Sequence, residues 1–151
     1  MTRTIIAALL LATVAHAGPT LREVAAQKLA TAHLAKWERT RWEQIAAGNV
    51  AAKPVTVFAT SYGLWDNHPF KGDDYHIACN KLRQGTVVYV ELTGRLMVVT
   101  NCGAGSNDAW ARREGGQYWI DAWTRYAGMY GLGCKTTRLW VIGDAPEWRR
   151  K

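Results

Sequence analysis

Two runs of branched and aliphatic residues, separated by a Thr-Gly pair, most limit how this chain can fold. Thr86 to Leu92 reads Thr-Val-Val-Tyr-Val-Glu-Leu, and Arg95 to Thr100 reads Arg-Leu-Met-Val-Val-Thr, with Thr93-Gly94 between them. Branched side chains favour strands, and a short glycine-containing turn favours antiparallel pairing of the strands on either side. The pattern therefore predicts a β-hairpin over residues 86–100.

Two other runs, Val55 to Thr60 and Arg138 to Ile142, have the same strand character. Between the hairpin and the last run, the polar stretch 103–117 is expected to be a loop. Asp121 to Tyr130 contains alanines and aromatic residues, and we predict one short helix there. Strands thus dominate residues 53–142, which favours a small closed barrel because closure leaves no exposed sheet edge.

Residues 1–17 are predicted to be a secretory signal and not part of the fold. The segment carries a positive charge at Arg3, an apolar run from Ile5 to Val14 and the small-residue ending Ala15-His16-Ala17. This order is typical of a cleaved signal, and the apolar run is about half the roughly 20 residues that a membrane-spanning helix needs. We expect cleavage after Ala17 and an exported, soluble product in the periplasm or outside the cell.

After the signal, residues 18–50 are expected to be a helical segment, residues 51–147 the barrel domain and residues 148–151 a basic tail. Thr20 and Glu23 have the spacing of a capping box, and Gly48 supplies a stop signal. We therefore predict one helix over residues 20–47.

The predicted helix is rich in lysine and arginine, and three roles for it stay open. It could pack on the domain or act as a spacer, it could face the wall or a membrane surface, or it could dock on a protein partner. Without residues 1–17 the chain has 18 Lys and Arg against 12 Asp and Glu, a net charge of about +6. Such a charge favours polyanionic surroundings, but the basic residues are dispersed and no nucleic acid partner is expected.

Three cysteines follow the signal, at positions 79, 102 and 134. In an exported protein this number allows one disulfide and one remaining thiol, and three pairings are open. We favour Cys79 with Cys102, because both adjoin predicted strands that could be neighbours. The cysteines form no CxxC pair and the histidines are scattered, so no metal site and no cofactor are expected.

Four segments occur in an order that resembles a known barrel family. They are Ala59-Thr-Ser-Tyr-Gly63, Leu82-Arg-Gln-Gly-Thr-Val-Val-Tyr-Val90, Val98-Val-Thr-Asn-Cys-Gly103, and Trp119-Ile-Asp-Ala-Trp123 with Gly131-Leu-Gly133. Together they resemble the double-psi β-barrel of rare lipoprotein A and the three-aspartate (3D) domain, shared by the expansins and by membrane-bound lytic transglycosylase A. The resemblance spans residues 55–142 and implies a mainly β fold: a six-stranded double-psi barrel with a short inserted helix, preceded by the N-terminal helix.

The resemblance also implies cleavage of peptidoglycan glycan strands by a secreted lytic transglycosylase. Asp121 matches the aspartate that acts first as general acid on the glycosidic oxygen and then as general base on the muramic acid 6-hydroxyl. Internal attack by a sugar hydroxyl needs only one such group, whereas an ordinary hydrolase uses two carboxylates. Asp121 could instead simply cap the predicted helix, because aspartate is a favoured N-cap residue.

Six further residues are candidates for contacts with the glycan. They lie in the matching segments, carry aromatic faces that can stack on sugar rings, or, for His76, precede by three residues the position of the family's histidine. They are Tyr62, Trp65, His76, Asn101, Gly103 and Trp123. Asn101 stands where the family usually has an aspartate, and Cys79 stands where it has a histidine. These departures keep open a second function, an expansin-like barrel that binds wall glycan without cutting it. We expect a monomer.

Overall fold

The computed structural model describes residues 18–50, 53–62, 76–101, 107–123 and 133–144. Three helices and six strands lie in these ranges: α1 (Leu21–Thr31), α2 (Lys36–Ala46), β1 (Pro54–Tyr62), β2 (His76–Ala78), β3 (Thr86–Val90), β4 (Arg95–Asn101), α3 (Asn107–Arg113), β5 (Trp119–Trp123) and β6 (Lys135–Asp144). No helix in this part of the chain has both the length and the apolar character to cross a bilayer. The predicted signal and the basic tail lie outside the described residues.

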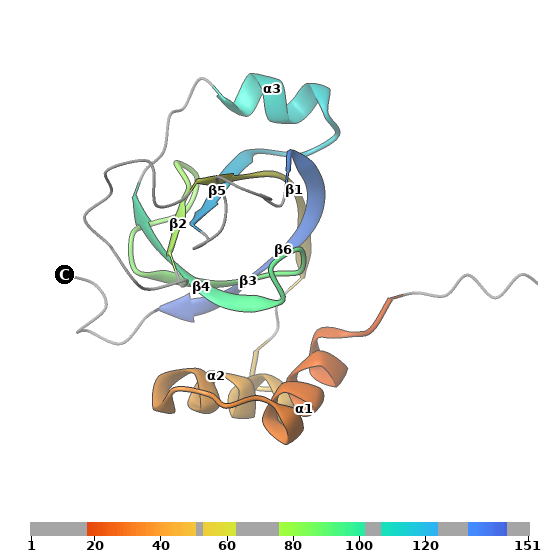
Figure 1. The fold of residues 1–151 in the computed structure, drawn as a ribbon, viewed down its shortest axis with the longest axis vertical. Coiled ribbons are helices and arrows are strands. Elements are labelled where there is room, and N and C mark those ends of the chain that lie inside the picture. The colour runs from red at the N-terminus through yellow and green to blue at the C-terminus, as the bar shows by residue number, and fades with distance from the viewer. Residues whose placement is uncertain (1–17, 51–52, 63–75, 102–106, 124–132, 145–151) are drawn as a thin grey trace, which may run out of the picture.

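The six strands form one closed barrel in the order β1-β5-β2-β4-β3-β6 (Figure 1). The β1–β5 and β2–β4 pairs are parallel, and the other four pairs are antiparallel. The predicted hairpin is confirmed: Val87 lies opposite Val98, and Val90 lies opposite Arg95. Gly94, in the turn, has a φ of +63°, which a residue with a side chain rarely adopts. The predicted strands near residues 55–60 and 138–142 are also confirmed.

Side chains alternate between the inside and the outside of the barrel along each strand. Eleven buried residues fill the interior: Val57, Ala59, Ile77, Cys79, Val88, Val90, Met97, Val99, Ile120, Ala122 and Leu139. Their neighbours in sequence face outward, where helices cover part of the surface. Away from the register shifts at Ile77/Ala78 and Val87/Val88, the two-residue period assigns most strand residues to the core or to the outer face.

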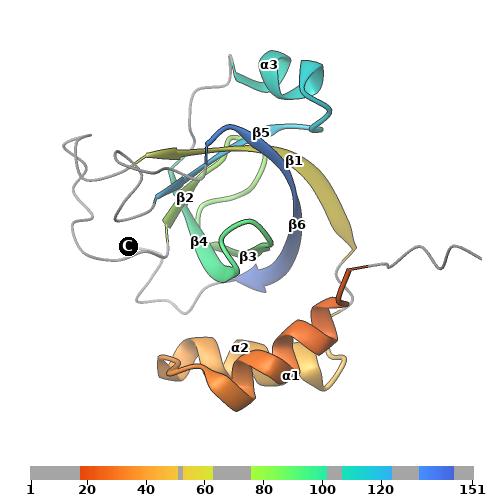
Figure 2. The same cartoon turned by 45° about the vertical axis from the view of Figure 1, so that its right-hand side comes forward.

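A helical hairpin packs on the outer face of β3, β4 and β6, as the two views show (Figure 1 and Figure 2). Its buried side chains, including Trp42 and Ile45, contact outward residues of these strands such as Leu96. The rings of Trp42 and Tyr89 meet edge to face, with their centroids 5.4 Å apart. The hairpin is thus packed on the domain, as one of the three roles left open for this segment requires.

The prediction of a single helix over residues 20–47 is wrong, because the chain breaks between Thr31 and Lys36. Ala32 has an extended conformation, and so does Ala35, whose N–H donates to the Glu38 carboxylate at 3.2 Å. One helix of that length would run about 40 Å, well past the barrel. Folding back lets both halves contribute to the same apolar cluster, a tertiary gain that outweighs local helix propensity.

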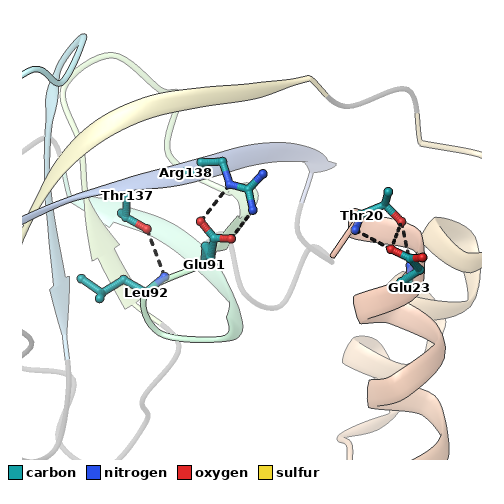
Figure 3. A network of polar contacts seen from close by, with 6 residues as sticks. All are labelled: Thr20, Glu23, Glu91, Leu92, Thr137 and Arg138. Atoms are coloured by element: carbon teal, nitrogen blue, oxygen red, sulfur yellow. Dashed lines mark hydrogen bonds and ion pairs between the residues drawn. The ribbon is translucent and has the colours of Figure 1, made fainter. Parts of the chain in front are cut away.

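Two groups of polar contacts fix the ends of these elements (Figure 3). The predicted capping box is present: Glu23 N–H donates to Thr20 Oγ1 at 3.2 Å, and Thr20 N–H donates to Glu23 Oε2 at 2.7 Å. Next to the hairpin turn, the Arg138 guanidinium binds both carboxylate oxygens of Glu91. The hydrogen bond from Arg138 lowers the pKa of Glu91 and outweighs the effect of partial burial. This pair ties the end of β3 to β6.

The predicted inserted helix over 121–130 is wrong at its start, because residues 119–123 are strand β5. Ile120 and Ala122 are fully buried inside the barrel, so the segment follows a two-residue period that its alanine and aromatic content concealed. Asp121 therefore does not cap a helix. Residues 124–130 of that prediction lie outside the described residues. A short helix, α3, lies within the stretch expected to be a loop, and its Ala111 is buried against Phe58 and Trp119.

Replacing Trp42 with alanine should lower the free energy of unfolding by about 3–5 kcal/mol, because the side chain is 1% exposed and lies between hairpin and barrel. Urea unfolding followed by far-ultraviolet circular dichroism measures the change. Glu43→Ala, at the exposed neighbouring position of α2, should change it by less than about 0.5 kcal/mol. Equal effects of the two substitutions would show that the hairpin does not stabilise the barrel.

Candidate functional site

Asp121 lies on the outer face of the barrel, in the middle of β5. Its two neighbours in sequence, Ile120 and Ala122, point into the interior, so the Asp121 side chain points outward and is half-buried. Across the strands, Asp121 is in register with Thr60 of β1 on one side and with Ala78 of β2 on the other. The Thr60–Asp121 pair lies two residues beyond the Phe58–Trp119 pair, which α3 covers.

Thr60 and Trp119 hold the Asp121 carboxylate. The Thr60 hydroxyl is 2.7 Å from Asp121 Oδ1, and the Trp119 indole N–H donates to the same hydroxyl oxygen at 2.9 Å. Since the indole N–H can only donate, it occupies an acceptor position of Thr60 and directs the Thr60 proton away, toward the carboxylate. The three side chains form a directed chain of hydrogen bonds from Trp119 through Thr60 to Asp121.

A second carboxylate, Asp108 of α3, is held by the same tryptophan residue. Trp119 backbone N–H donates to Asp108 Oδ1 at 3.1 Å, Asn80 Nδ2 donates to Oδ2 at 3.3 Å, and Lys81 Nζ lies 3.1 Å from Oδ2. Burial by itself would raise the pKa of Asp108, but the hydrogen bonds from Trp119, Lys81 and Asn80, together with the Lys81 charge, outweigh it and lower the pKa. Asp108 is therefore an ionised structural carboxylate that joins α3 to β5.

The strand register places several predicted glycan-binding residues near Asp121. Tyr62 of β1 is in register with Trp123 of β5, two residues beyond the Thr60–Asp121 pair. Asn101 of β4 is in register with Ala78, which is itself opposite Asp121. Asp121 and Asn101 thus stand two strand spacings apart, or about 10 Å between backbones.

His76 is the first residue of β2 and is buried. It precedes Ile77, which is in register with Ala122 of β5, so it lies at the same end of the sheet as Trp123. The other two candidates, Trp65 and Gly103, fall outside the described residues. The structure therefore brings Tyr62, His76, Asn101 and Trp123 to strands around Asp121.

Cys79 is a buried free thiol inside the barrel, and Cys134 is an exposed one. Burial raises the pKa of Cys79, and the nearby Asp108 charge adds to the effect. The thiol is therefore protonated and poorly nucleophilic. Cys102, the predicted partner of Cys79, lies outside the described residues, and Cys79 itself makes no disulfide in this structure. Within the described ranges, no three His, Cys, Asp or Glu side chains gather as a metal site would require.

The chain was compared with protein-family models, with curated proteins and with solved structures, and none of them matches. The description of the site therefore depends on its own geometry.

Sequence reasoning missed the roles of Thr60, Asn80 and Lys81. Thr60 is in the first matching segment, but its contact with Asp121 depends on the parallel pairing of β1 with β5. No local pattern predicts which strands pair across sixty residues. The available signal was the alternation around Ile120 and Ala122, which places Asp121 and Trp119 on one face.

Thr60→Val should lower the free energy of unfolding by about 1–3 kcal/mol, because it removes the acceptor of the Trp119 indole N–H and the donor to Asp121. Thr60→Ser keeps the hydroxyl and should cost much less. Urea unfolding measures both, and the indole N–H resonance of Trp119 should move in Thr60→Val alone. An unmoved resonance would contradict the hydrogen-bond chain.

Protonation of Asp108 should lower the free energy of unfolding in acid. Its folded pKa lies below its ordinary value of 3.8, so its contribution is complete above that pH and is lost as the pH falls through the lower folded value. Asp108→Asn should flatten the acid part of the curve of unfolding free energy against pH. The matched control is Glu114→Gln at the exposed residue after α3, which should leave the curve unchanged. An unaltered slope in Asp108→Asn would contradict the assignment.

Proposed function

We propose that this chain is an exported protein that cleaves the glycan strands of peptidoglycan, with Asp121 as general acid and then general base. The order of its four sequence segments supports this proposal. The closed barrel, in which two parallel strand pairs stand among antiparallel ones, supports assignment to the double-psi type. In this proposal the periplasmic or extracellular glycan is the partner, and no cofactor takes part.

The observation that carries the proposal is the directed hydrogen-bond chain that ends at Asp121. A general acid must be held in one orientation and must also be reachable by the atom that it protonates. Thr60 fixes one carboxylate oxygen at 2.7 Å, and the side chain stands on the outer face, half-buried. Tyr62 of β1 and Trp123 of β5 are in register with each other two residues beyond the Thr60–Asp121 pair, and Asn101 of β4 lies two strands from Asp121. The proposal assigns contacts with the sugar chain to these positions.

In the proposed reaction, protonated Asp121 gives its proton to the glycosidic oxygen as the bond between that oxygen and the anomeric carbon of the muramic acid residue breaks. The 6-hydroxyl oxygen of the same residue then bonds to the anomeric carbon. Its proton returns to the Asp121 carboxylate, so the enzyme is regenerated and no water is consumed. The products are a new chain end and a 1,6-anhydro ring.

Asp108 favours this route over ordinary hydrolysis. Hydrolases usually place a second carboxylate near the acid, either to attack the sugar or to activate water. Asp108 is bound to the backbone of Trp119, two residues before Asp121. Three donors already bind its carboxylate, and its side chain is 6% exposed. Its lowered pKa keeps it ionised. It is thus engaged in holding α3 and β5 together, and of these two described carboxylates the proposal assigns the acid and base role to Asp121.

The second candidate is a barrel that binds wall glycan without cutting it. One observation favours it: the Thr60–Asp121 hydrogen bond joins two adjacent strands and would stabilise the sheet without any proton transfer. In that case the candidate glycan-binding residues around Asp121 would bind the sugar chain and no proton would be transferred. The two candidates differ in product formation and agree in binding.

Purified protein incubated with peptidoglycan sacculi should release anhydromuropeptides, detected by mass spectrometry, and Asp121→Asn should reduce their release by at least about 100-fold. The matched control Glu114→Gln, at an exposed position after α3, should keep full activity. Ordinary reducing ends would indicate hydrolysis. If neither the wild type nor Asp121→Asn releases fragments while both sediment with sacculi, the enzyme proposal fails and the binding barrel replaces it.

A further inference from the structure

The Thr60 hydroxyl has two acceptors within hydrogen-bond distance. Asp121 Oδ1 lies 2.7 Å from Thr60 Oγ1, and the backbone carbonyl oxygen of Ile120 lies 3.4 Å from it. A hydroxyl carries one proton, so it donates to one of these oxygens at a time. Hydroxyl donors usually stand about 2.5–3.0 Å from their acceptor, so the carboxylate receives the proton in this structure and the carbonyl is a second acceptor within reach.

Trp119 holds a third position of the same hydroxyl. Its indole N–H donates to Thr60 Oγ1 at 2.9 Å and cannot accept, so it occupies one lone pair of that oxygen whatever the protonation state of Asp121. The Trp119 side chain is packed with Phe58 and Ala111 and is only 5% exposed, which keeps the indole in place. The second lone pair of Thr60 and its single proton are left to respond to Asp121.

Asp121 changes from an acceptor to a donor when its Oδ1 takes up a proton. The ionised carboxylate only accepts, and Thr60 then donates to it; a protonated Oδ1 donates and needs an acceptor. The second lone pair of Thr60 Oγ1 is that acceptor, once the hydroxyl proton has turned to the Ile120 carbonyl. A carbonyl oxygen has two lone pairs, so it can accept this bond as well as one within the sheet. Both protonation states of Asp121 thus find a partner at the same place.

We propose that Thr60 is a positioning residue whose hydrogen bond with Asp121 reverses with the protonation state of the carboxyl group. Thr60 donates to the carboxylate, whereas it accepts from the carboxylic acid and donates to the Ile120 carbonyl. The O–H bond of Thr60 stays intact throughout and only rotates. Asp121 therefore keeps one orientation as acid and as base.

The use of this reversal in turnover rests on the proposed glycan cleavage. The bond between Asp121 Oδ1 and its proton breaks as that proton bonds to the glycosidic oxygen, and the electron pair stays on the carboxylate. The Thr60 hydroxyl then turns back from Ile120 and stabilises the new charge by donating to it. When the proton of the 6-hydroxyl returns to Asp121, the hydroxyl turns to Ile120 again.

The test is a pH titration of the purified protein followed by carbon-13 nuclear magnetic resonance of the Asp121 carboxyl carbon and the Ile120 carbonyl carbon. We expect both signals to move with one midpoint, because the Ile120 carbonyl gains a hydrogen bond when Asp121 is protonated. The Ile120 shift should be largely lost in Thr60→Val and kept in Thr60→Ser, which retains the hydroxyl. The matched control is Thr56→Val, the same change at an exposed position of β1, which should leave the shift at its wild-type size.

Other titrating groups are separated by the midpoint and by two variants. The described titratable residues on the neighbouring strands and in the hydrogen-bond network are Tyr62, His76, Lys81 and Asp108. Asp108→Asn should leave the Ile120 shift unchanged, and Asp121→Asn should abolish it. An Ile120 signal that does not move in the wild type while Asp121 titrates, or that moves as far in Thr60→Val, would overturn the proposal.

Release of anhydromuropeptides from sacculi is the second readout. Thr60→Val should lower the maximal rate about tenfold, the effect of losing one hydrogen bond to a charged group, and change the half-saturating amount of sacculi less than about twofold. Thr60→Ser should restore the rate. The titration needs no substrate, so a wild type that releases nothing would end the glycan proposal and leave the titration as the test of Thr60. An active wild type with an equally active Thr60→Val would refute the role in turnover.

Discussion

Hydrogen bonding between β1 and β6 closes the sheet into a barrel. Because the barrel is closed, different elements cover different parts of its outer surface. β1 pairs with β6 along Pro54 to Ala59 and with β5 along Phe58 to Tyr62, so its two ends serve different neighbours. Closure gives every strand two partners and turns one face of each strand inward. The outward face is then shared by the helical hairpin, by α3 and by the row that contains Asp121.

Trp119 connects the parts of that row. Its indole N–H reaches Thr60 and through it Asp121, while its backbone N–H reaches Asp108 of α3. The two carboxylates therefore have different environments although one residue serves both. Asp108 is buried and bound by three donors, whereas Asp121 remains half-buried on the outer face. In the proposed reaction only Asp121 transfers protons, and Asp108 serves the scaffold.

The sequence predicted the strands whose pattern is strongest. Branched residues at 86–90 and 95–100 produced a confirmed hairpin, and the barrel followed from the number of strands. β2 has three residues and β5 has five, too few for a two-residue period to identify a strand. In β5 the alanine and tryptophan content also favoured a helix over a strand. The break between the two helices at residues 32–35 contains no glycine or proline that could predict it. It results from the packing of both helices against the barrel, which is a tertiary effect.

The sequence predicts Asp121 as a site residue but places it at the start of a helix, whereas it lies in strand β5. Its hydrogen-bond partners become known only from the three-dimensional structure. Thr60 and Asp121 are 61 positions apart and meet through a parallel pairing that no local signal encodes. The resemblance to a barrel family predicts Asn101 and Tyr62 as glycan contacts. The register places Tyr62 two residues beyond the Thr60–Asp121 pair and Asn101 two strands from Asp121, and this placement depends on the strand order.

The two described cysteines lie in opposite environments, Cys79 inside the closed barrel and Cys134 on its surface. An alkylating reagent can reach Cys134 in the native protein, whereas it reaches Cys79 only when strands separate, because the interior has no access to solvent at that position. The chain thus carries an internal reporter of barrel opening. The rate at which Cys79 is alkylated, compared with the loss of helical signal, distinguishes opening of the barrel from detachment of the hairpin that covers it.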